Sequence, residues 1–111
     1  MPGEYLTLTQ RKQTRTEAIR SGISTVRAVL SDYGRAHGGR FLLYGSAVRG
    51  DLHYDSDVDL LVDFPETTLA DAWRFAENAC WDRDLTPDIM PLRWCKATFL
   101  AHVAPTGEWL G

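Results

Sequence analysis

The fold of this chain is decided by the stretch Gly45-Ser46-Ala47-Val48-Arg49-Gly50 and by Ser56-Asp57-Val58-Asp59-Leu60-Leu61-Val62, which follows five residues later. The second stretch contains a run of branched aliphatic residues that is typical of a β-strand. Because side chains alternate between the two faces of a strand, both carboxylates, two residues apart, are expected on one face. Carboxylates held this close repel each other unless a cation lies between them, and Mg2+ commonly takes such carboxylates together with substrate phosphates. The pair therefore predicts a magnesium site.

The first stretch follows the apolar residues 41–44, Phe-Leu-Leu-Tyr, which we expect to form a short buried strand. Gly45 lets the backbone turn sharply and approach a ligand closely. Ser46 then opens a helical turn, whose free N–H groups and positive partial charge favour an anion, and its hydroxyl adds a donor. The turn is therefore predicted to bind phosphate. Arg49, one turn further on, is placed either to reach the same anion or to pair with an acid of the same loop.

Together the two stretches resemble the signature of the polymerase-beta-like nucleotidyltransferase superfamily, which is Gly-Ser, ten residues, and Asp-x-Asp. A fuller pattern, which resembles the minimal nucleotidyltransferase branch of that superfamily, is present at Gly45, Ser46, Arg49, Gly50, Ser56, Asp57, Asp59 and Leu60. The resemblance extends over nearly the whole chain. It implies an α/β (α+β) fold, with a small mixed β-sheet flanked by helices.

The family pattern has a third carboxylate on a later strand, and three acids compete for that place. Asp82 and Asp84 lie at the polar end of an expected helix, where a charged side chain is usually just solvated. Asp88 follows Pro87, which disfavours helix before it, and precedes Ile89-Met90, which suit a short strand. We therefore assign the third acid to Asp88.

The resemblance implies transfer of a nucleoside monophosphate from a triphosphate to an acceptor hydroxyl, with loss of pyrophosphate. Asp57 and Asp59 would hold two Mg2+ ions beside the α-phosphorus, and Asp88 would ligate the ion nearest the acceptor and take its proton. The turn at Gly45-Ser46 would hold the terminal phosphates. Ser56 is expected to orient the loop through its hydroxyl.

Chains that resemble the minimal branch are commonly antitoxins paired with a HEPN-domain ribonuclease toxin, and they add AMP to a tyrosine of that toxin. The resemblance thus implies ATP as substrate and a HEPN-type toxin as partner, with an oligomer formed with that partner. Two alternatives stay open: a binding module that masks a partner protein without catalysis, and an enzyme that modifies a small molecule, as aminoglycoside-modifying relatives do. Three mutually repelling carboxylates favour an enzyme, since a pure binder has no physical need of them.

The length predicts a single domain over residues 1–111, with a loose start at residues 1–8, and the resemblance implies that it is a nucleotidyltransferase domain. The net charge is −3 and the basic residues form no stripe, so we do not expect binding of long nucleic acid. Cys80 and Cys95 lack metal-ligand spacing and are expected to be buried apolar side chains rather than a disulfide. With no signal peptide and no long apolar span, a cytoplasmic protein without a membrane segment is expected.

Helical periodicity predicts a first helix from Thr16-Glu17 to His37, closed by Gly38-Gly39. A second helix is expected from Leu69 to about Asp82, capped by Thr68, and a last one over roughly residues 93–103. Residues 108–110 are expected to be a short tail. The four tryptophans are expected mostly in the core, with Trp81 or Trp109 as possible partner anchors, and the three histidines (His37, His53 and His102) show no metal-ligand spacing.

Overall fold

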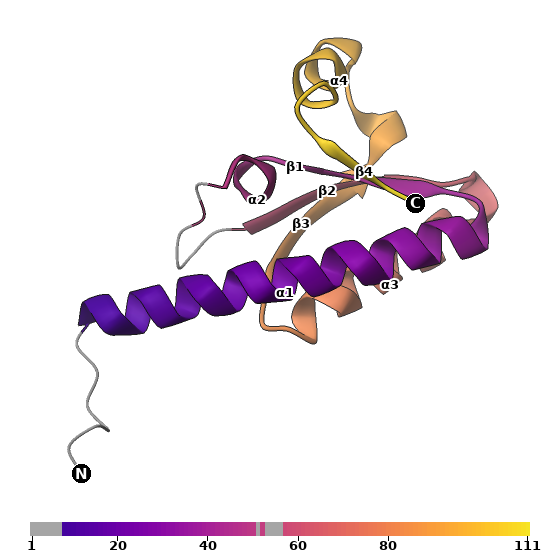
Figure 1. Ribbon diagram of the computed structural model, residues 1–111. Helices are drawn as coiled ribbons and strands as arrows, with labels where there is room; N and C mark the ends of the chain where they lie inside the picture. Colours follow the sequence, from indigo (N-terminus) through magenta and orange to yellow (C-terminus); the bar gives the residue numbers. More distant parts are fainter. Residues whose placement is uncertain (1–7, 51, 53–56) are drawn as a thin grey trace.

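The computed structural model describes residues 8–50, 52 and 57–111 of the chain. Helices and strands follow one another in the order α1 (Leu8–His37), β1 (Arg40–Tyr44), α2 (Ser46–Arg49), β2 (Asp57–Asp63), α3 (Glu66–Trp81), β3 (Thr86–Pro91), the 3-10 helix η2 (Leu92–Trp94), α4 (Ala97–Val103) and β4 (Glu108–Leu110) (Figure 1). The expected α/β fold, a small mixed sheet flanked by helices, is confirmed.

The four strands form one sheet in the order β3-β2-β1-β4. β1 pairs antiparallel with both β2 and β4, whereas β2 and β3 are parallel. A parallel pair requires a crossover, and α3 makes it between β2 and β3. Pro87 and Pro91 lie in β3, which is an edge strand, where the missing N–H of proline is tolerated.

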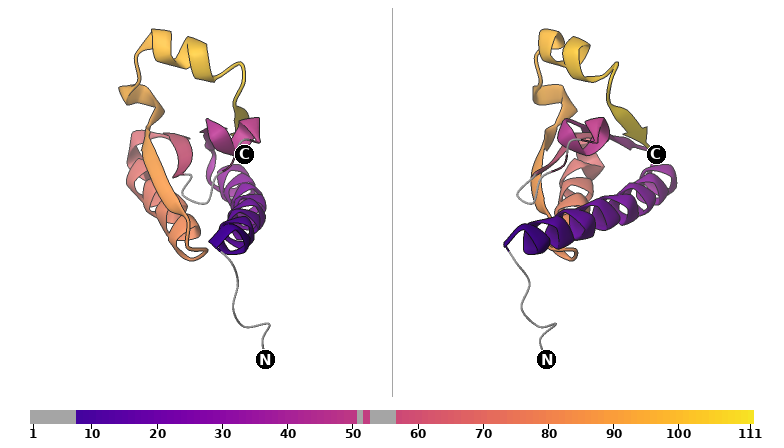
Figure 2. Two further views of the ribbon diagram at one scale, coloured as in Figure 1. Left: turned by 90° about the vertical axis from the view of Figure 1, so that its left-hand side faces the viewer. Right: turned by 60° about the vertical axis from the view of Figure 1, so that its left-hand side comes forward.

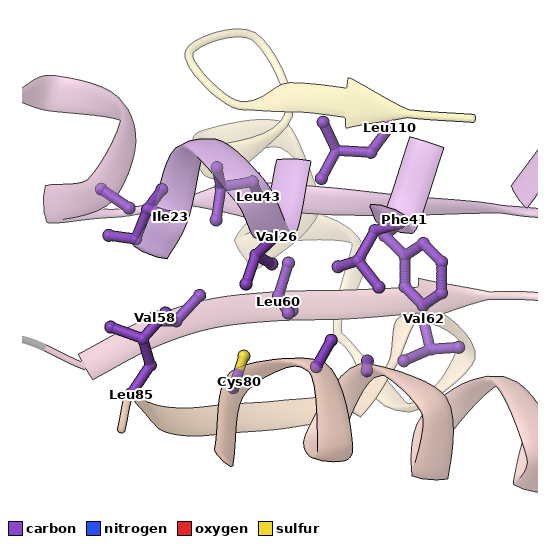
Figure 3. Close-up of a cluster of buried hydrophobic side chains, with 14 of the residues drawn as sticks. Ile23, Val26, Phe41, Leu43, Val58, Leu60, Val62, Cys80, Leu85 and Leu110 are labelled. Atoms are coloured by element: carbon purple, nitrogen blue, oxygen red, sulfur yellow. The ribbon is translucent and has the colours of Figure 1, made fainter. Parts of the chain in front are cut away.

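One face of the sheet is covered by α1 and α3, and this layer holds the larger core (Figures 1 and 3). Strand residues of alternating position, such as Phe41 and Leu60, meet the apolar stripe of α1, which includes Ile23 and Leu30. α3 contributes mainly small side chains, among them Cys80, so its axis can lie close to the sheet. The opposite face carries a smaller cluster around Leu42, Leu61 and Val103, over which α4 lies (Figure 2).

Several expected boundaries were wrong. α1 begins at Leu8, not at Thr16-Glu17, because eight of the eleven residues before Ile19 are good helix formers even though they bear no apolar stripe. Leu8 therefore belongs to a helix rather than to a loose start, and residues 1–7 lie outside the described part of the chain. α3 begins at Glu66, so Thr68 is inside its first turn, where its hydroxyl donates to the Pro65 carbonyl at 3.3 Å instead of capping the helix.

The C-terminal third departs most from expectation. The expected last helix is divided into η2 and α4, and the expected tail is the strand β4. The tryptophans are not mainly in the core: Trp81, Trp94 and Trp109 are 56%, 65% and 39% exposed. Cys80 is buried, as expected, whereas Cys95 is only partly buried, and both are free thiols. Within the described residues, none of the helices combines the length and apolar character needed to cross a membrane.

Candidate active site

The three predicted acids lie on one face of the sheet, the face that α4 covers only in part. On β2, Asp57 and Asp59 alternate with Val58 and Leu60, which point into the core with α1 and α3. Asp59 and Leu61 therefore share the other face, and Leu61 packs there beneath α4. The two carboxylates thus project from the open part of the α4 face, as the two-residue spacing predicts.

The parallel register of β2 and β3 places Asp88 directly beside Asp59, close enough for its charge to raise the pKa of Asp59. Asp82 is the C-cap residue of α3, and Asp84 lies in the following turn with φ 56°. Neither residue is on a strand. Of the three candidates for the third acid, the structure brings Asp88 to the other two.

Burial and the repulsion between carboxylates in this cluster shift the pKa of Asp59. The pKa of Asp59 is raised to about 6, first by burial and then by the negative charges of Asp88 and Asp57, while Arg49 partly opposes the rise. The negative charges of Asp88 and Asp57 therefore disfavour the ionised form of Asp59. A divalent cation bound by these carboxylates would relieve the repulsion between them.

The described residues do not form a complete metal cage. Among them, no set of three or more His, Cys, Asp or Glu side chains is gathered closely enough to hold an ion alone. A hard cation that takes one or two carboxylates and completes its shell with water and phosphate oxygens still fits the donor set. Asp59 and Asp88 are the pair best placed to hold it, and Asp57 adds charge from two residues away.

The turn after β1 lies against the acids. Gly45 has φ 79°, and a Cβ atom built on it would overlap Oδ2 of Asp59, so only glycine allows this approach. The carbonyl of Gly45 accepts from the N–H groups of Val48 and Arg49, both at 3.1 Å, which starts α2 directly at Ser46. Gly50, with φ 84°, ends α2 in the left-handed conformation. The predicted phosphate-binding turn is therefore next to the predicted metal ligands.

The remaining predicted residues are less defined. Arg49 is an exposed residue at the end of α2, and its charge acts on Asp59. Both of its predicted roles, a phosphate contact and a pairing with a nearby acid, agree with this place. Ser56 lies outside the described residues.

Two residues near the site were missed by sequence reasoning. Tyr44 is the partner of Asp59 across β1 and β2, and burial followed by the charges of Asp59 and Asp88 raises its pKa to about 12, so its hydroxyl remains a hydrogen-bond donor. Arg27 of α1 donates to the Ala47 carbonyl of α2 at 3.3 Å and to Glu108 of β4 at 3.0 Å. Arg27 is remote in sequence, so no local spacing signals it.

A small mixed sheet with carboxylates on two neighbouring strands and a Gly-Ser turn beside them defines a phosphoryl-transfer protein of the nucleotidyltransferase class. The family model for the nucleotidyltransferase domain matches residues 23–100, and the chain belongs to this family. Neither the curated proteins nor the solved structures gave a significant match. The matched range runs from α1 to α4, so it contains all the described site residues, and the activity it indicates is nucleotidyl transfer.

Proposed function

We propose that the protein transfers AMP from ATP to a hydroxyl group of a partner protein, a tyrosine of a HEPN-type toxin, and thereby acts as an antitoxin. The observation that carries the catalytic part is the meeting of Asp59, Asp88 and Gly45 at one point of the sheet. Family membership supports nucleotidyl transfer in general. The choice of partner rests on the resemblance of residues 45–60 to the minimal branch.

In this proposal Asp57, Asp59 and Asp88 would hold two Mg2+ ions, which would supply neutralisation of the charge on the phosphates and on the reacting oxygens. The backbone at Gly45-Ser46 holds the terminal phosphates and so fixes the direction of the triphosphate. Asp88 takes the proton of the acceptor hydroxyl as the new oxygen–phosphorus bond forms, and pyrophosphate leaves as the old bond breaks. Positioning and charge neutralisation are most of what this reaction requires.

The modification would silence an RNA-cleaving toxin by itself. An adenylyl group adds bulk and a negative charge, and both oppose the entry of RNA phosphates into a cleft. Silencing would persist after the two proteins separate. A masking module, in contrast, would inhibit only while it is bound, and an enzyme for small molecules would leave the toxin unchanged.

The test is intact-mass spectrometry of the partner after co-expression with the wild type and with variants. We expect the wild type to add the mass of one or more adenylyl groups, and the Asp57→Ala/Asp59→Ala variant to add none. Asp88→Asn should abolish transfer, whereas the matched change Asp84→Asn, in the turn before β3, should do little. A double variant that neutralises the toxin as well as the wild type, with no adduct in either case, would replace the proposal with the masking module.

A further inference from the structure

A cavity of about 310 Å³ adjoins the candidate active site at the end of β1. Its lining comes from two distant parts of the chain: Tyr44, Gly45 and Arg49 on one side, and His102, Val103 and Thr106 on the other. The second group belongs to the last turn of α4 and to the turn that leads into β4. The cavity therefore joins the predicted phosphate-binding turn to α4, an element that the catalytic proposal does not use.

We propose that this cavity receives the terminal phosphates of the bound triphosphate and then the leaving pyrophosphate, with His102 and Thr106 as contacts from the α4 side. This inference rests on the proposed function and adds the leaving-group site to it. It assigns His102 and Thr106 a direct role in substrate binding.

The order of the strands indicates on which side of the phosphorus the pyrophosphate leaves. On the α4 face, Asp88 of β3, Asp59 of β2 and Gly45 at the end of β1 follow one another across neighbouring strands about 5 Å apart. In-line transfer puts the attacking oxygen and the leaving oxygen on opposite sides of the phosphorus. If the acceptor is on the Asp88 side, pyrophosphate leaves on the β1 side, where the cavity is.

The chemistry of the lining fits an anion. The cavity is lined by a guanidinium, an imidazole and a hydroxyl group, and the residues that line it include no carboxylate. The Thr106 hydroxyl donates to the Val103 carbonyl over 3.5 Å, a long bond that it can exchange for a phosphate oxygen. The volume is roughly ten times the ~30 Å³ of one water molecule in the liquid, which leaves room for two phosphate groups with some of their water.

The inner wall of the cavity is apolar. The Tyr44 ring packs edge-on against Phe99 of α4 with ring centroids 5.8 Å apart, and Val103 is buried. Arg49, His102 and Thr106 are on the exposed side of the cavity, where a phosphate can reach them from solvent.

The test is calorimetric binding of ATP, pyrophosphate and AMP in buffer with Mg2+, with the full chain. We expect His102→Asn and Thr106→Val each to weaken pyrophosphate and ATP about tenfold, the usual effect of losing one hydrogen bond to a charged group, and to leave AMP unchanged. Thr106→Ser, which keeps the hydroxyl, should bind as the wild type does. His37→Asn, the same change at the end of α1 beyond the opposite end of β1, serves as the matched control.

Both residues are exposed, so these variants should fold, and their melting temperatures will verify it. Wild-type binding of ATP with Mg2+, together with unchanged pyrophosphate affinity in both variants, would overturn the inference and leave the proposed function standing. Weaker AMP binding with unchanged pyrophosphate binding would also overturn it, because the cavity would then hold the nucleoside. A wild type that binds neither ATP nor pyrophosphate would overturn the proposed function and the inference with it.

Discussion

Asp59 is partly buried, with Asp57 two residues away on its own strand and Asp88 beside it on β3. Its raised pKa means that the folded chain favours the protonated form more than the unfolded chain does. The contribution of that proton to stability is fully present below about pH 4 and is lost as the pH rises through about 6. At neutral pH and without metal, the ionised Asp59 carboxylate therefore destabilises the folded state.

Asp59→Asn should thus stabilise the metal-free protein at pH 7.5. The shift of about two pKa units corresponds to about 2.7 kcal/mol, and partial exposure with solvent screening reduces the expected gain to about 1 kcal/mol. The gain should shrink between pH 6 and pH 4 and vanish below that range. Urea unfolding at a series of pH values measures it, and a gain that stays constant over this range would contradict the electrostatic cause.

Gly45 and Gly50 allow a matched test of the turn. Both have positive φ, but a Cβ atom at Gly45 would overlap Asp59, whereas at Gly50 it would meet nothing within 4 Å. Gly50→Ala should cost about 1 kcal/mol of backbone strain and leave ATP binding intact. Gly45→Ala should cost about 2–3 kcal/mol and abolish ATP binding, because the acid must move. Equal losses of affinity in the two variants would contradict the close approach of Gly45 to Asp59.

The site residues that could be predicted from the sequence are those that lie close together in it. Gly45, Ser46, Asp57 and Asp59 are near one another in sequence, and alternation along one strand was enough to place both carboxylates on one face. Asp88 was predicted from the proline before it, yet its place beside Asp59 depends on a parallel register that no local pattern encodes. The residues contributed by α1 and α4 come from remote segments, and nothing in the sequence marked them.

At the scale of elements, the long helices were predictable because their apolar residues repeat with a helical period, and the first three strands were predictable from short apolar runs. β4 was not, since three residues are too few for a period. What holds β4 is long-range: antiparallel pairing with β1, the Arg27–Glu108 ion pair, and Arg40, whose guanidinium lies 3.6 Å from the ring centroid of Trp109. The exposed tryptophans were mispredicted because hydrophobicity indicates burial only as an average tendency.

α1 joins two segments with different roles. Residues 8–14 are all exposed, whereas the later turns supply Ile19, Ile23 and Val26 to the core. The first part adds no buried side chain to the core and depends mainly on helix propensity, whereas tertiary packing supports the second. A break in the helix should therefore have very different costs in the two parts.

Thr14→Pro and Ser24→Pro test this difference at exposed positions of the same helix. Proline removes a backbone hydrogen bond and clashes with the preceding turn, which costs about 3 kcal/mol or more in a packed helix. We expect that cost for Ser24→Pro, because the break displaces Ile23. Thr14→Pro should cost less than about 1 kcal/mol, since the chain before it can fray without exposing core. Denaturant unfolding compares the two, and equal costs would show that the first turns pack on the body.

At the scale of the whole molecule, the sheet separates stability from chemistry. The face under α1 and α3 contains most of the buried apolar side chains, and the α4 face contains the smaller cluster, the acids and the cavity. The acids can therefore repel one another without breaking the larger core. This arrangement also explains why the fold class could be predicted from the periodicity of apolar residues. The assembly of the site could not, because it depends on how the strands are paired in register.

Ligand binding should consequently be visible in global stability. A ligand that binds only the folded state stabilises it by about 2.7 kcal/mol at one hundred times its Kd, and for a domain of this size that is a rise in Tm of about 12 °C. We expect this rise with ATP and Mg2+ together, and little with either alone, because the phosphates complete the shell of an ion that the acids cannot enclose. The Asp57→Ala/Asp59→Ala variant should melt higher than the wild type without ligand, since its repulsion is relieved, and should show no rise with ATP and Mg2+. Thermal scans of both proteins measure this, and an equal rise in the variant would place the triphosphate away from the acids.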